Sequence, residues 1–158
     1  MADQPSIEIL IDADACPVKA EIYKVAARHG VSVKVVSNSP FRIPDSPLVS
    51  RILVDDGFDA ADDWIAENSG ARTIVITADI LLAERCLGAG SKVLGHNGKP
   101  FTSDMIGSAI ATRAIMADLR SGMAAADGIG GPPPFSKADR SNFLQSLDQI
   151  LHRLKRAG

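Results

Sequence analysis

An apolar run that ends in two carboxylates is the feature that most constrains the fold of this chain. Residues 7–11 contain four apolar, mostly β-branched side chains, Asp12 and Asp14 follow them, and Pro17 precedes a helical pattern. Such a run predicts a buried strand, and a proline of this kind predicts the first turn of a helix. Because ligands of open parallel sheets bind beyond the carboxyl ends of the strands, Asp12 marks a candidate site.

Length and composition are those of one globular domain. The chain has 158 residues, of which 46% are hydrophobic, so it can bury a core without disulfides. The formal net charge of -2 gives no basic footprint, and any nucleic-acid surface would have to be a local patch. Cys16 and Cys86 suit reduced thiols, and no apolar segment is long enough to cross a bilayer. We therefore expect a cytoplasmic protein without a membrane anchor.

Short β-branched runs alternate with amphipathic helical patterns along the chain. Strands are expected at residues 7–12, 31–37, 51–54, 73–77 and 92–94, and helices at 59–68, 80–87 and 106–117 and from about residue 18 to Gly30. This alternation is typical of βαβ units. It predicts a single three-layer α/β domain spanning residues 1–158, with a central, mainly parallel sheet of about five strands flanked by helices.

The C-terminal part contains a loop and a final helix. Residues 121–135 are rich in Gly and Pro and predict a mobile loop. The apolar spacing over about 136–156 predicts an amphipathic helix that docks on the domain, and Ser136 and Asp139 are spaced as a capping box at its start. Because long loops often act as lids, we expect this loop to close over the site, with Arg140 directly after it.

Acidic residues recur where the predicted strands meet helices, at Asp12, Asp14, Asp55, Asp56, Asp59, Asp62, Asp63 and Asp79. Strand ends of one parallel sheet converge in space, and clustered carboxylates suit Mg²⁺ or Mn²⁺ together with substrate phosphates. A bound metal would lower the pKa of a water molecule and neutralise phosphate charge, while a carboxylate accepts the proton. The pattern therefore predicts metal-assisted phosphoester hydrolysis.

Each acid also has a structural interpretation, because Asp is favoured at helix N-termini. Asp79 directly precedes a predicted helix, Asp59 and Asp62 stand at the start of another, and the acids before Gly57 fit a turn. Asp12 is the hardest to explain in this way, because a charge buried after an apolar strand needs a partner or a metal.

Three motifs carry a resemblance to a known family. They are D-A-D-A-C-P-V-K at 12–19, V-I-T-A-D-I-L-L-A at 75–83 and G-P-P-P-F-S-K-A-D-R at 131–140. Through them the chain resembles the bacterial YaiI/YqxD family over nearly its whole length. That family is similar to PIN-like domains, which are α/β metal-dependent ribonucleases with acids at their strand ends.

The PIN-like resemblance implies an acidic metal site. Residues 62–66 resemble the Asp-x-x-Ile-Ala helix start of PIN domains, and residues 77–79 resemble their Thr-x-Asp motif. The further acid that many PIN domains carry after this motif is absent here. The implied catalytic residues, which are also metal ligands, are Asp12, Asp14, Asp62 and Asp79, with Asp59 as a further metal ligand. The implied cofactor is Mg²⁺ or Mn²⁺, and the implied partner is RNA or another nucleic acid.

Candidate substrate ligands lie near the expected catalytic edge: Lys19, Asn38, Arg113 and Arg140. Arg113 interrupts an apolar helix face, so it pairs with the acids, with a substrate phosphate or in a structural salt bridge. Arg42 is a phosphate ligand or an ordinary solvated charge. Cys16 is a reactive thiol at a helix start or, as we favour, a small residue before proline. The histidines are expected at the surface because they show no ligand spacing: His29, His96 and His152.

The sequence thus predicts a PIN-like domain that acts as a metal-dependent nuclease on RNA. One alternative is a noncatalytic module that binds nucleic acid or a protein partner and keeps the acids for stability. A second is a phosphatase of the haloacid-dehalogenase type, in which the first Asp of Asp-x-Asp is the nucleophile. Such enzymes need a further acidic motif late in the chain, and the segment after Ile76 offers no paired acids.

Overall fold

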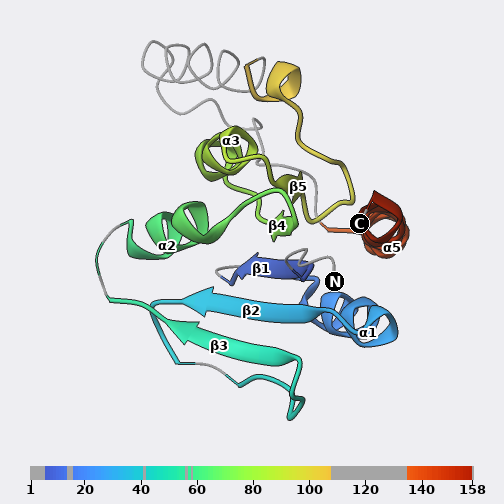
Figure 1. Ribbon diagram of the computed structural model, residues 1–158, viewed down its shortest axis with the longest axis horizontal. Helices are drawn as coiled ribbons and strands as arrows, with labels where there is room; N and C mark the ends of the chain where they lie inside the picture. Colours follow the sequence, from blue (N-terminus) through green and yellow to red (C-terminus); the bar gives the residue numbers. More distant parts are fainter. Residues whose placement is uncertain are drawn as a thin grey trace, which may run out of the picture.

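The computed structural model describes residues 6–13, 16–40, 42–55, 57, 59–107 and 135–157. Strands and helices alternate along these residues (Figure 1). In chain order they are β1 (Glu8–Asp12), α1 (Lys19–His29), β2 (Ser32–Ser37), β3 (Val49–Leu53), α2 (Ala60–Asn68), β4 (Thr73–Ile76), α3 (Ile80–Gly88), β5 (Lys92–Leu94) and α5 (Lys137–Ala157). The predicted α/β class is confirmed, and β3 begins two residues before the strand expected at 51–54.

The five strands form one sheet in the order β3-β2-β1-β4-β5, and every neighbouring pair is parallel. From β1 the chain builds outward through β2 to β3, and it then returns to the other side of β1 for β4 and β5. The strand order therefore reverses between β1 and β4. In doubly wound sheets the crevice at such a switch point, beyond the carboxyl ends of the strands, is the usual ligand site.

Helices cover both faces of the sheet, which gives three layers (Figure 1). Alternate strand residues such as Ile9 and Val33 pack with α1 and α5 in one core cluster. Their neighbours, such as Leu10 and Val75, pack with α2 and α3 in the other. The central strand is buried on both faces, as parallel strands usually are. This arrangement is consistent with the three-layer PIN-like fold.

The end of α1 and the start of α5 follow the expected chemistry, whereas Asp59, which precedes α2 (Ala60–Asn68), makes no capping hydrogen bond through its side chain. Helix α1 ends at Gly30, whose left-handed backbone (φ 68°) favours glycine. The predicted capping box before α5 is confirmed, because Ser136 N donates to Asp139 Oδ2 and Asp139 N donates to Ser136 Oγ, both at 3.1 Å. Helix α5 packs against α1 through buried residues such as Phe143.

Gly98 provides a second contact surface for α5. It is buried, its φ is 85°, and a Cβ built on it would lie 2.6 Å from the backbone carbonyl carbon of Asn142. The turn after β5 therefore packs against the backbone of α5 at a position that only glycine fits.

Several expectations fall outside the described residues. These are Asp14, Asp56, Arg113, nearly all of the helix expected at 106–117 and the loop at 121–135 except Phe135. None of the helices in the described part of the chain has both the length and the apolar character of a membrane span.

Candidate active site

Asp12 is the last residue of β1 and lies beside the switch point of the sheet. Its carboxylate accepts a hydrogen bond at Oδ2 from the hydroxyl of Thr77, at 2.9 Å. Thr77 follows β4 directly and is fully buried, and its Oγ1 accepts a hydrogen bond of 3.0 Å from Asp79 N. The Thr77 side chain therefore links the ends of the two central strands and holds one oxygen of the Asp12 carboxylate in place.

Asp79 caps helix α3. Its Oδ1 accepts hydrogen bonds from Leu81 N at 2.9 Å and Leu82 N at 3.4 Å. The capping interpretation of this residue is confirmed, and a role in metal binding stays a prediction. A carboxylate oxygen that accepts two backbone bonds is held in place, which suits an ordered ligand as well as a cap.

Asp62 lies in the first turn of α2 and is half-buried. Its pKa is raised above the ordinary value, mainly by burial and then by the negative charges of Asp79 and Asp59. The Arg85 guanidinium opposes this shift but forms its own ion pair with the neighbouring Asp63, at 2.9 Å. The carboxylates of Asp59 and Asp79 therefore lie close enough to repel that of Asp62 at this edge of the sheet.

The donor chemistry of this edge fits Mg²⁺ or Mn²⁺, because all of the predicted ligands are carboxylates. In this structure the described acids do not close into a compact ligand set. Among the described residues, the only group of three His, Cys, Asp or Glu side chains with ligand atoms all within 4.8 Å of one another is a different one, formed by His29, Asp148 and His152. A metal bound at the acidic edge would have to draw Asp12, Asp62 and Asp79 closer together.

The predicted substrate ligands differ in their surroundings. Asn38 is exposed directly after β2, and Lys19 is the half-buried first residue of α1. Arg140 Nη1 lies 2.8 Å from Glu21 Oε1 and donates to Pro17 O at 3.2 Å, so it ties α5 to the start of α1. A substrate role for these residues stays a prediction, and for Arg140 it would compete with an existing ion pair.

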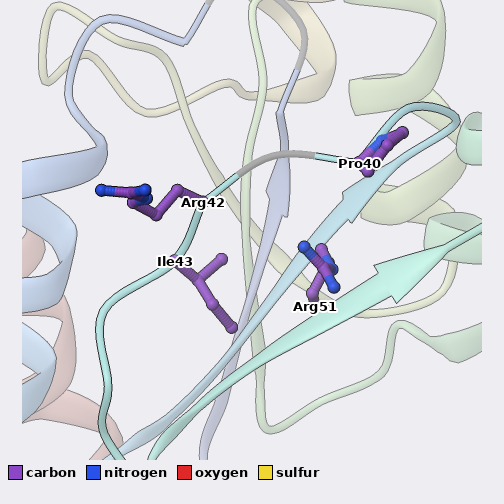
Figure 2. A pocket seen from close by; sticks show the side chains of 4 residues that line it. All are labelled: Pro40, Arg42, Ile43 and Arg51. Atoms are coloured by element: carbon purple, nitrogen blue, oxygen red, sulfur yellow. The ribbon is translucent and has the colours of Figure 1, made fainter.

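An open pocket of about 710 Å³ lies beside the edge strand β3 (Figure 2). Arg51 comes from β3, whereas Pro40, Arg42 and Ile43 come from the segment that joins β2 to β3. Pro40 closely follows the carboxyl end of β2, so the pocket begins at the edge of the sheet that carries Asp12. Two arginines therefore line one pocket, and Figure 2 shows that their side chains point in different directions.

Comparison with known proteins assigns the chain to a family. A model of the family described as "Uncharacterized BCR, YaiI/YqxD family" matches residues 10–153. The chain belongs to the YaiI/YqxD family. This family membership confirms the resemblance that the three sequence motifs indicate.

The relatives carry the name UPF0178 protein. The chain is 70% identical over 148 residues to one from Sphingopyxis alaskensis, covering 94% of this chain and 95% of the relative. It is 55% identical over 152 residues to one from Nitrobacter winogradskyi, covering 96% and 95%. No solved structure matches the chain significantly.

In this YaiI/YqxD family member, Cys16 is not set up as a reactive thiol. The side chain is buried, and burial is the main cause that raises its pKa above the ordinary value. Reactive cysteines have lowered pKa values, so the interpretation of Cys16 as a small residue before proline is the one supported.

The expectation that the histidines lie on the surface is wrong for His29. Only 4% of its side chain is exposed, and Nε2 lies 2.7 Å from Asp148 Oδ1. Asp148 lies 119 residues after His29, so the local spacing of residues does not predict this contact. The Thr77 hydroxyl does have a usable signal in the sequence, because a threonine at the end of the strand adjacent to that of Asp12 can reach its carboxylate.

Proposed function

We propose that this YaiI/YqxD family member is a metal-dependent phosphodiesterase that cleaves RNA. The observation that carries the proposal is the position of Asp12 at the switch point of the sheet, with its carboxylate oriented by the buried Thr77. A charge held at the usual ligand crevice of a doubly wound sheet, close to a field of like charges, favours cation binding.

The roles of the residues follow from their chemistry. Asp12, Asp62 and Asp79 would hold Mg²⁺ or Mn²⁺, which when bound supplies a water of lowered pKa and neutralises phosphate charge. Thr77 keeps the Asp12 carboxylate in one orientation. The raised pKa of Asp62 reflects burial and the like charges of Asp79 and Asp59, which a bound cation would neutralise.

The pocket lined by Arg42 and Arg51 supports a nucleic-acid substrate. Guanidinium groups match phosphate geometry, and phosphate contacts position a strand without reading its sequence. One lining residue, Pro40, closely follows the carboxyl end of β2, the strand paired with that of Asp12.

The test is cleavage of single-stranded and structured RNA by the purified chain with Mn²⁺, with Mg²⁺ and with excess chelator. Asp12→Asn should lower the rate by about 100-fold or more, because losing several kcal/mol of metal-dependent stabilisation costs tenfold per 1.36 kcal/mol. Asp104→Asn, a substitution at an exposed acid after β5, is the matched control and should keep the rate of the unmodified protein. Cleavage that persists at full rate in Asp12→Asn, with the fold intact by circular dichroism, would overturn the site.

A second candidate is a noncatalytic module that binds nucleic acid. The capping role of Asp79 favours it, because a residue that satisfies two backbone donors of α3 has a structural reason to be acidic. Retention of RNA in the absence of metal, with no cleavage under any condition and weaker binding by Arg42→Gln, would favour this function over the first.

A further inference from the structure

The junction of α1 and α5 carries a compact group of metal-ligating side chains. His29 Nε2 lies 2.7 Å from Asp148 Oδ1, and His152 Nε2 lies 3.5 Å from Asp148 Oδ2. The two imidazole rings meet edge to face, with their centroids 4.8 Å apart. His29 ends α1, and Asp148 and His152 are one turn apart on α5, so the group joins two helices that are distant in the sequence.

The distances approach those of a tetrahedral site. Zinc bonds of about 2.0–2.2 Å to nitrogen and oxygen place neighbouring ligand atoms about 3.3 Å apart. The two His–Asp separations, 2.7 Å and 3.5 Å, lie near this value, and ligand atoms of all three residues lie within 4.8 Å of one another, so metal binding would draw them together. Two imidazole nitrogens with one carboxylate suit a transition-metal dication better than Mg²⁺. The His152 side chain is 60% exposed, which leaves solvent access for a water molecule as the fourth ligand.

Two cationic side chains lie beside this group. Lys155 Nζ lies 3.0 Å from His29 Nδ1 and 3.0 Å from the carbonyl oxygen of His29, and Arg28 Nη1 lies 3.5 Å from Asp148. An ammonium group can only donate, so His29 Nδ1 accepts and Nε2–H points at Asp148. Metal binding at Nε2 therefore requires the proton to be on Nδ1 and Lys155 to release that nitrogen. Both cationic side chains are exposed and can move into solvent.

We propose that His29, Asp148 and His152 bind Zn²⁺ or a similar transition-metal dication that holds α5 on α1, in competition with Lys155. The site is independent of the proposed nuclease function. His29 precedes β2 at the amino edge of the sheet, whereas Asp12 lies at the carboxyl edge. The two sites also differ in ligands, because one offers imidazole nitrogens and the other only carboxylates.

The test is titration of the chelator-treated full chain with Zn²⁺ by calorimetry and with Co²⁺ by visible absorption. One equivalent should bind at the imidazole site, in addition to any taken up by the carboxylates, and Co²⁺ there should give the intense d–d band of a tetrahedral site. Losing a group that only supports a ligand costs about 10–100-fold in affinity, so His152→Gln, which removes a ligand, should cost about 100-fold or more. His152 is exposed, so this substitution leaves the packing of α5 intact.

Two further variants make the result specific. Lys155→Met should bind Zn²⁺ more tightly than the unmodified chain, because it removes the competing donor. Arg153→Gln changes an exposed cation on the same helix and should leave affinity unchanged. The proposal is overturned if no equivalent of Zn²⁺ binds or if His152→Gln binds it as tightly as the unmodified chain.

Discussion

Carboxylates at the two edges of the sheet have pKa values that are shifted in opposite directions. At the carboxyl edge, burial and the neighbouring carboxylates of Asp79 and Asp59 raise the pKa of Asp62. At the amino edge, the hydrogen bond from His29 lowers the pKa of Asp148. Like charges that face one another oppose folding, whereas paired opposite charges stabilise it. Removing an acid at one edge and removing an acid at the other should therefore change stability in opposite directions.

Asp148→Ala should have the largest effect on stability. It leaves Nε2–H of the buried His29 without its acceptor, and an unsatisfied buried donor costs about 1–3 kcal/mol. For a chain of this size, each kcal/mol lowers Tm by about 2–4 °C. The measurement is thermal unfolding in the presence of chelator, with Asp104→Ala as an exposed control. A Tm equal to that of the unmodified chain would show that the amino edge does not depend on its pairing.

The contribution of Asp148 should also depend on pH. The His29 hydrogen bond and the charges of His152 and Arg28 favour the ionised carboxylate and outweigh burial, so its folded pKa lies below the ordinary value. The stabilisation is therefore complete above that ordinary value and is lost as pH falls through the folded pKa. Unfolding free energies of the unmodified chain and Asp148→Ala should differ at pH 7 and converge near pH 2. A constant difference across this range would contradict the linkage.

Asp62→Asn should stabilise the fold by a smaller amount. The folded pKa of Asp62 is raised, so its ionisation costs stability as pH rises through that value, and the cost is absent below the ordinary pKa. Because Asp62 is only half-buried, we expect a gain below about 1 kcal/mol at pH 7 and none near pH 3. Urea unfolding at both pH values measures this, and a loss of stability at pH 7 would contradict the proposed charge repulsion.

Arg85→Gln should have the smallest effect. Its ion pair with Asp63 is about half-exposed on both sides, and such pairs contribute about 0–1 kcal/mol. The substitution should change Tm by less than about 3 °C, within the scatter of surface substitutions. A larger loss would mean that Arg85 restrains the acidic edge more strongly than its exposure indicates.

The fold was readable from the sequence because each buried strand is a short β-branched run between helical patterns. Residues 92–94 were predicted with the observed bounds. The apolar pattern predicts the third strand at 51–54, whereas β3 begins at Val49. It is an edge strand with exposed Ser50 and Arg51, so its apolar pattern is weak. Strand order and the switch point depend on long-range pairing, which local periodicity does not encode.

The candidate site was only partly readable. The sequence indicates acids as candidates where they follow apolar strands. Asp79 also has the capping role that its position predicts. The sequence does not indicate which side chains are hydrogen-bonded to each other. The Thr77 hydroxyl reaches Asp12 across 65 residues, and His29 reaches Asp148 across 119, so neither contact has a signature in local spacing.

Gly98 couples two parts of the chain in a way that can be used experimentally. A methyl group there would meet the backbone of α5 at 2.6 Å, with no polar or charged group changed. Gly98→Ala should therefore push the turn and the final helix apart, and it also strains a backbone whose φ of 85° favours glycine. Truncating a side chain on α5 cannot relieve the clash, because the opposing atoms are main chain. The contact between the turn after β5 and the main chain of α5 thus sets how closely α5 packs against the rest of the domain.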